Sequence, residues 1–177
     1  MAFPPSLQTI KGICILDNDG KRVVSKYYDT KDETFSTVKD QKVFEGKVFK
    51  ATEKSSSEIV AINNYTVVFR SNVDLFFYVF GDSRENELML LSVLNALYES
   101  ISMILRKNVE KRALFDHMDS ILLICDEIVD RGILLECDAN NIVNRVHVKS
   151  EDIPLSEQTV TQVSYDILKS FNWLSQS

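Results

Sequence analysis

Two carboxylates near the start of the chain have the residue type and spacing that metal-assisted chemistry uses. Asp17 and Asp19 stand in the sequence ILDNDG, directly after the apolar residues 13–16. A carboxylate pair at the end of a buried strand can bind Mg²⁺, with one carboxylate as nucleophile and the other as acid and base in phosphoryl transfer. The letters Asn-Asp-Gly also favour a tight turn, and an apolar run resumes at Val23. The first hypothesis describes an enzyme and the second a scaffold.

The ILDNDG sequence resembles the opening motif of the haloacid-dehalogenase-type phosphatases, in which the first aspartate is the nucleophile. Gly81-Asp82 resembles the later metal-binding motif of the same family. Lys21, however, stands where that family usually has Thr or Val, and the chain returns as a second strand too soon for a parallel sheet. Asp82 with Glu85 is also explained as the N-cap of a helix. We therefore favour the turn and keep a Mg²⁺-dependent phosphatase using the first aspartate pair as the distant alternative.

The other residues capable of chemistry do not form a catalytic or metal-binding set. His117 and His147 have no cysteine or carboxylate at ligand spacing, which is typical of surface or helix-end histidines. Cys14 and Cys125 lie inside apolar runs, so we expect both to be small buried hydrophobes in a reducing, cytosolic compartment. We expect no enzyme activity, no cofactor and no metal.

Two charged clusters are candidates for a protein interface. The basic cluster comprises Arg106, Lys107, Asn108, Lys111 and Arg112. It fits the favourable placement of cations at a helix C-terminus, with Asn108 as the break, or a contact for an acidic partner surface or membrane headgroups. The acidic cluster comprises Asp126, Glu127 and Asp130. It is typical of a solvated helix face, and the rim of an interface is the second interpretation.

The composition limits the classes of partner. The 177 residues are 45% hydrophobic and 26% charged, as in a globular domain. A formal net charge of −6 argues against nucleic acid as the main partner, because phosphate neutralisation needs an excess of Lys and Arg. The first residues do not have the pattern of a secretory signal, and no apolar run approaches the length of a membrane span. Any membrane contact is therefore expected to be peripheral.

Apolar runs and turn residues predict five strands. They are expected over residues 10–16, 23–28, 58–62, 65–70 and 74–81. The first and last runs are apolar on both alternating faces, so both should lie centrally with helices on each side. The predicted fold class is α+β, with a mainly antiparallel five-stranded sheet flanked by helices on both faces. The predicted order is β-β-α-β-β-β-α-α plus a C-terminal helix.

The helical segments follow apolar spacings of three and four residues. A loosely helical segment covers 30–52, and a long helix begins at an Asp82 N-cap and carries an apolar stripe. That stripe comprises Leu88, Leu91, Leu94, Tyr98, Ile101 and Leu105. A second helical run covers 114–129 and stops at Gly132, where a C′ glycine is expected. A short edge strand over 132–138 and a small helix from Asn140 follow it.

Pro154 opens a last amphipathic helix in the prediction. Its stripe comprises Val160, Val163, Ile167, Phe171 and Leu174. We therefore predict a main domain over residues 1–150, whose longin-like adaptor character is implied only by the resemblance described next, and a C-terminal extension with this helix over 151–177.

Several long blocks resemble one family, the zeta subunits of coatomer, the COPI-type coat of Golgi vesicles. They are ILDNDGKR with KYY, TVVFRSNVDLFFYVFG, ENELMLLSVLNALYESISMILRKNVEKR and DEIVDRGILLECD. The resemblance covers about residues 8–162, and Arg131 stands where the family tends to have a second glycine. It implies a longin-like domain of the small adaptor subunits, which agrees with the elements predicted above.

The resemblance also implies partners and a location. A non-catalytic small subunit of this kind is held by the helical solenoid of the large gamma subunit within heptameric coatomer. The Arf GTPase recruits that complex to Golgi membranes, and it supports Golgi-to-ER retrograde and intra-Golgi transport. The chain would then be cytoplasmic, and peripheral on the cytosolic face of Golgi membranes and COPI-coated vesicles. A sigma-type small chain of a clathrin adaptor is the alternative within the same fold.

Overall fold

The computed structural model describes residues 9–29, 32–53, 55 and 57–151. The predicted helix from Pro154 lies outside these residues. The division into a domain over 1–150 and an extension over 151–177 therefore stays a prediction.

A five-stranded antiparallel sheet organises the described chain. Its strands are β1 (Ile10–Asp17), β2 (Arg22–Tyr27), β3 (Ile59–Ile62), β4 (Tyr65–Asn72) and β5 (Leu75–Asp82). They lie in the order β2-β1-β5-β4-β3, and every neighbouring pair is antiparallel. This confirms the predicted fold class and the central position of the two strands that are apolar on both faces.

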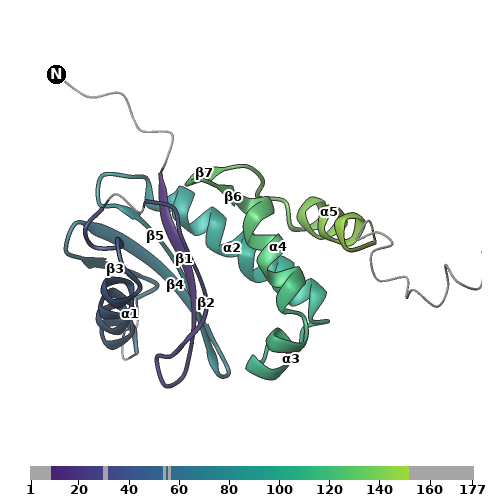
Figure 1. Cartoon of the computed structure of the whole chain (residues 1–177), viewed down its shortest axis with the longest axis horizontal. Helices are drawn as coiled ribbons and strands as arrows, with labels where there is room; N and C mark the ends of the chain where they lie inside the picture. Colours follow the sequence, from purple (N-terminus) through teal and green to yellow (C-terminus); the bar gives the residue numbers. More distant parts are fainter. Residues whose placement is uncertain (1–8, 30–31, 54, 56, 152–177) are drawn as a thin grey trace, which may run out of the picture. The chain divides into compact units, whose positions relative to one another are not determined.

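Helices cover both faces of this sheet (Figure 1). The helices are α1 (Val38–Thr52), α2 (Glu87–Ile104), α3 (Lys111–Asp116), α4 (Met118–Ile128) and α5 (Ala139–Glu151). The short pair β6 (Val129–Asp130) and β7 (Ile133–Leu134) forms a second, two-stranded sheet. Helix α1 packs on one face, and α2 and α4 lie on the other. The predicted helical segment over 30–52 is helical only from Val38.

Alternation along β1 and β5 sends side chains into two separate cores. Ile15 and Phe77 point toward α2 and are 0% exposed. Their neighbours Leu16 and Tyr78 point toward α1 and are buried among Phe44 and other aromatic rings. Burying each of these large side chains stabilises the fold by about 1.5–3 kcal/mol. The sheet is therefore stable only with a helix layer on each side.

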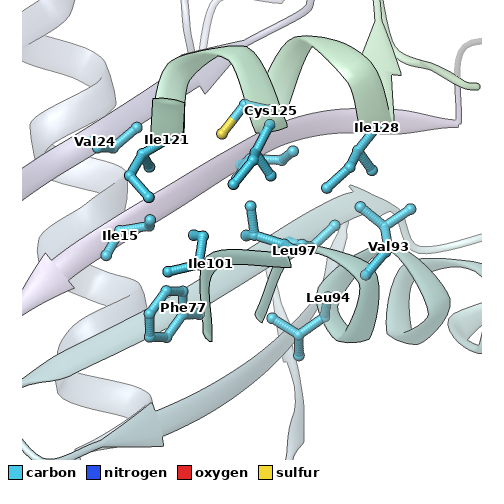
Figure 2. Close-up of a cluster of buried hydrophobic side chains, with 14 of the residues drawn as sticks. Ile15, Val24, Phe77, Val93, Leu94, Leu97, Ile101, Ile121, Cys125 and Ile128 are labelled. Atoms are coloured by element: carbon cyan, nitrogen blue, oxygen red, sulfur yellow. The ribbon is translucent and has the colours of Figure 1, made fainter. Parts of the chain in front are cut away.

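The core between the sheet, α2 and α4 is built from branched aliphatic side chains (Figure 2). Leu97 and Ile101 from α2 meet Ile121 and Ile128 from α4 there. Cys125 lies in the same core, and burial raises the pKa of its thiol to about 12, so the thiol stays protonated. Cys14 is buried on the other face. Both cysteines are thus the small buried hydrophobes that the sequence predicts.

Helix α2 differs in detail from its prediction. By length and composition it is apolar enough to span a membrane, contrary to our expectation, but Leu90, Leu94 and Leu97 line the core against the sheet. Leu88 is 70% exposed and lies outside the buried stripe. At 100° per residue, Leu88 stands opposite Leu97, which is fully buried.

The N-cap of α2 is Asn86, so the predicted cap at Asp82 is wrong. The Asn86 Oδ1 atom accepts a hydrogen bond from the Leu88 N–H at 2.9 Å. Asp82 instead ends β5, and its carboxylate accepts hydrogen bonds from the Arg84 backbone N–H and guanidinium. The Glu85 N–H donates to the Asp82 carbonyl at 3.0 Å, which closes a turn before the helix. Asp82 and Asn86 are both residue types that favour an N-cap. Because the chain forms a turn at Asp82 before it becomes helical, Asn86 is the residue that caps α2.

Gly132 is not the C′ residue of a helix, which corrects a second prediction. The helical run breaks at His117 into α3 and α4, and α4 ends at Ile128. Arg131 and Gly132 then form the tight turn between β6 and β7, with φ values of 48° and 82°. Such a turn needs positive φ at both central residues, which explains why a glycine is common at either position. The Ile10 N–H donates to the Gly132 carbonyl at 3.1 Å and ties this turn to β1.

Helix α1 is held on the sheet by an ion pair as well as by aromatic rings. Phe44 and Val48 enter the core beneath the helix. Glu45, which is 4% exposed, pairs with the Arg22 guanidinium at 2.7 Å and accepts a hydrogen bond from the Tyr27 hydroxyl at 2.8 Å. Both partners belong to β2, so the buried carboxylate fixes α1 against one edge of the sheet.

The opposite edge of the sheet is the short apolar strand β3. Phe69 N–H donates to the Glu58 carbonyl, which leaves the backbone groups of Ile59 directed away from β4. The Ser57 hydroxyl accepts from the Ile59 N–H at 3.3 Å and donates to the Ile59 carbonyl at 2.9 Å. The Ser57 side chain thus forms hydrogen bonds with the outward-facing N–H and C=O groups of Ile59.

A glycine in the middle of α1 yields the first prediction. A Cβ atom at Gly46 would meet no atom within 4 Å, so Gly46→Ala should raise the free energy of unfolding by about 0.5–1 kcal/mol. Gly81→Ala is the matched control and should lower it, because its Cβ would lie 2.6 Å from the Thr9 carbonyl oxygen. Urea unfolding measures both. A Gly46→Ala protein no more stable than wild type would contradict the open surroundings of position 46.

Candidate protein interface

The predicted basic cluster begins in the turn that ends α2. The Lys107 N–H donates to the Ser102 carbonyl at 2.7 Å, and the Arg106 N–H donates to the Met103 carbonyl at 3.2 Å. These two bonds define a Schellman motif, which normally has glycine in the left-handed position. Here Arg106 and Lys107 take φ values of 51° and 69°. Helix α2 therefore ends at Ile104, just before these residues, rather than at the predicted Asn108, and the long side chains of Arg106 and Lys107 are exposed.

The loop between β4 and β5 holds this turn in place. The Asn72 side-chain amide donates to the Val109 carbonyl at 3.1 Å. The Asp74 carboxylate accepts from the Lys111 backbone N–H at 3.1 and 3.2 Å, at the first residue of α3. Between them stands Val73, which is 84% exposed and has φ 43°. This contact is not predicted from the sequence, because Asn72-Val73-Asp74 indicates only a turn between two strands.

Asp17 is the second anchor of the basic cluster. Its carboxylate is 2% exposed and accepts a hydrogen bond from the Lys111 ammonium at 2.7 Å. It also accepts from the backbone N–H groups of Asp19 at 3.0 Å and Lys21 at 2.8 Å, across the turn between β1 and β2. Asp17 therefore belongs to the predicted turn between two strands, and its carboxylate is buried there.

The electrostatics of Asp17 favour its charged form. Burial acts to raise its pKa, but the hydrogen bonds from Lys111, Lys21 and Asp19 outweigh burial, so the pKa of Asp17 lies below its ordinary value. The hydrogen bond to this carboxylate raises the pKa of Lys111. The pair is charged at neutral pH and connects the turn between β1 and β2 to the first residue of α3, 94 positions away in the sequence.

The geometry does not support the phosphatase alternative. The lone pairs of Asp17 are used by an ammonium and two backbone N–H groups, and Asp19 is exposed beside Lys21. Strand β1 turns directly into antiparallel β2, whereas that chemistry needs a parallel arrangement with a crossover. Over the part of the chain that the structure describes, no group of three His, Cys, Asp or Glu side chains could hold a metal ion.

The predicted acidic cluster is divided between surface and interior. Asp126 is exposed and pairs with Lys26 of β2. Glu127 is buried and lies 3.6 Å from the Arg145 guanidinium of α5. Asp130 is exposed in β6.

The two predicted clusters do not form one site. The basic cluster precedes α4 and the acidic cluster stands at its C-terminal end, about 16 Å along the helix. His117 is exposed at the junction of α3 and α4, and His147 is exposed on α5, as expected for surface or helix-end histidines. The arrangement offers charged surface on a rigid domain.

Comparisons with known proteins give this surface a context. The clathrin adaptor complex small chain family matches residues 9–153. Coatomer subunit zeta-1 of Homo sapiens is 52% identical over 173 residues, covering 98% of this chain and 96% of that protein. Coatomer subunit zeta-2 of Mus musculus is 48% identical, covering 96% and 81%. Coatomer subunit zeta-1 of Arabidopsis thaliana is 43% identical, covering 92% of each.

A structural neighbour agrees on the fold. One chain of a homology model of the full-length AP-3 complex in a stretched open conformation superposes with a TM-score of 0.61. It is 19% identical, and the match covers 80% of this chain and 94% of that chain.

The Asp17–Lys111 pair predicts a pH-dependent contribution to stability. A carboxylate whose pKa is lowered by folding stabilises the fold above its unfolded-state pKa of about 3.9 and loses this effect as the pH falls through its folded-state pKa. We expect Asp17→Asn to lower the free energy of unfolding by about 1–3 kcal/mol at pH 7. The difference from wild type should shrink in urea titrations below about pH 4.

The exposed neighbour supplies the control for this measurement. Asp19→Asn should change the free energy of unfolding by less than about 0.5 kcal/mol at either pH. A difference between wild type and Asp17→Asn that stays constant down to about pH 3 would contradict the role given to the charged pair.

Proposed function

Because the chain belongs to the clathrin adaptor complex small chain family, and within it to the coatomer zeta subunits, we propose that it acts as a non-catalytic subunit of a heteromeric vesicle coat. The observation that carries this proposal is 52% identity to a coatomer subunit over nearly the whole length of both chains. The polar groups of the Asp17 hairpin support it, because their hydrogen bonds fasten the fold rather than bind a substrate.

We further propose the large gamma subunit as the partner that holds this chain. Recruitment by the Arf GTPase would then act on the complex, and the chain would reach Golgi membranes and COPI-coated vesicles peripherally from the cytosol. The role would be in Golgi-to-ER retrograde and intra-Golgi transport. The backbone of the turn at the end of α2 is held by hydrogen bonds, which suits such a scaffold because an ordered backbone loses little further entropy on binding.

The exposed members of the two charged clusters are the proposed contacts. In the basic cluster the exposed residues are Arg106, Lys107 and Asn108 after α2, and Arg112 in α3. In the acidic cluster they are Asp126 in the last turn of α4 and Asp130 in β6. Lys111 takes a positioning role instead, because its ammonium binds Asp17. Glu127 supports α5 from within the fold through Arg145.

Purification of the tagged full chain from cytosol tests the proposal. Near-physiological salt should recover coat subunits in a fixed ratio, including a large solenoid subunit of the gamma type. Recovery of a clathrin-adaptor large chain would favour the sigma-type alternative, and recovery of the lone monomer would count against both. Mg²⁺-dependent phosphomonoester hydrolysis that disappears in Asp17→Asn would contradict the non-catalytic assignment.

A double charge reversal tests the proposed contacts. Lys107→Glu with Arg112→Glu should reduce recovery of the large subunit at least about tenfold, since like charges oppose an acidic partner surface. Both side chains are exposed, so the free energy of unfolding should stay within about 0.5 kcal/mol of wild type. Unchanged recovery would remove the basic cluster from the interface while leaving the coat assignment intact.

A further inference from the structure

The outer face of α1 carries four lysines around a glycine. Lys39, Val43, Gly46 and Lys50 follow one another at spacings of four, three and four residues, so they form one stripe along the helix. Lys42 and Lys47 flank this stripe, and all four lysines and Val43 are exposed. We call this surface the α1 lysine face.

The charges of the α1 lysine face are not neutralised within the described fold. None of the ion pairs formed by the described residues involves its four lysines. The carboxylates of the same helix are engaged elsewhere: Asp40 accepts hydrogen bonds from the Ser36 and Thr37 hydroxyls at the N-cap, and Glu45 binds Arg22. In a chain with a net charge of −6, this is a local excess of positive charge that favours an anionic partner.

Gly46 adds an observation that the fold itself does not explain. Glycine inside a helix lowers its stability, and a Cβ at this position would meet nothing within 4 Å. Gly12 and Gly81, in contrast, are explained by the fold, because a Cβ atom there would clash with the Phe80 ring and lie 2.6 Å from the Thr9 carbonyl oxygen, respectively. A glycine in the middle of an exposed helix face lets another backbone approach closely.

A hollow lies beside the same face. It has a volume of about 330 Å³ and is lined by Gly20, Lys21, Arg22, Lys42 and Glu45. The Arg22–Glu45 pair forms a rigid wall, because both side chains are held by each other and by β2. Among the lining residues Lys21 is paired with Asp19, whereas Lys42 forms no ion pair with a described residue and supplies a positive charge that suits a carboxylate side chain.

We propose that the α1 lysine face docks an acidic helix of a protein partner, which crosses α1 at Gly46. Carboxylates of that helix would pair with the four lysines, and one would enter the hollow beside Lys42. The inference rests on α1 and the adjacent turn alone, so it stands independently of the proposed coat function.

A lipid bilayer fits this face less well than a protein helix does. Helices that lie on membranes insert large apolar side chains, whereas Phe44 of α1 is buried in the core and Phe49 packs against Phe76. The exposed apolar residues are Val38 and Val43, which are small.

The test uses the full chain and a synthetic helical probe of alanine and glutamate, with the glutamates on one face. Fluorescence anisotropy should show binding at about 0.05 M salt that weakens strongly by about 0.5 M. Lys39→Glu with Lys50→Glu should weaken it at least about tenfold. Arg84→Glu with Arg131→Glu changes the formal charge equally at exposed positions outside the α1 lysine face and the basic cluster, and should leave binding within about twofold.

Gly46→Gln separates docking from stability. Glutamine favours a helix more than glycine does, so the variant should unfold at a higher temperature yet bind the probe at least about fivefold more weakly. Equal weakening by both charge-reversed pairs would overturn the proposal, as would unchanged binding in Gly46→Gln. Phosphatidylserine vesicles are the comparison ligand, and vesicle binding through the same lysines in preference to the acidic helix would also overturn it.

Discussion

The burial of β1 and β5 on both faces is the constraint on which the rest of the structure depends. Two neighbouring strands whose side chains are apolar on both sides cannot face water on either side, so each face needs its own helices. Aromatic side chains fill the core under α1, and branched aliphatic side chains fill the core under α2 and α4. The two helix layers in turn determine which parts of the surface are left to meet other molecules.

Polar contacts then fasten the helix layers at the ends and edges of this sheet. Asp17 and Asp74 reach Lys111 from two different hairpins and set the path of the chain after α2. Glu45 performs the corresponding task for α1 through Arg22. In the Asp17–Lys111 and Glu45–Arg22 pairs, a buried carboxylate binds a cation on a different element. Removing the cation of either pair would leave an uncompensated buried charge. The exposed lysines and arginines lie on elements whose positions are thus fixed, and this suits a protein that works by presenting surface.

Sequence reasoning succeeded where short-range patterns decide the structure. The hairpin turns at Gly20 and Asn63 have positive φ, as their residue types indicate, and alternating apolar runs located all five strands. It failed where two local explanations compete, as at Asp82 and Gly132, because cap and turn positions favour the same residues. The contact between Asp17 and Lys111 could not be predicted from the sequence, since no local pattern links residues so far apart. The family resemblance, rather than periodicity, pointed to a coat subunit.

Ser57 has a consequence for the subunit before it meets any partner. A short apolar strand such as β3, left open at the margin of a sheet, is a template on which a second copy could extend the ladder. Because the Ser57 hydroxyl already satisfies the outward N–H and C=O of Ile59, an incoming strand would have to displace both hydrogen bonds before forming its own. The Ser57 hydroxyl thereby covers one outward-facing residue of this edge strand without adding a charge to it.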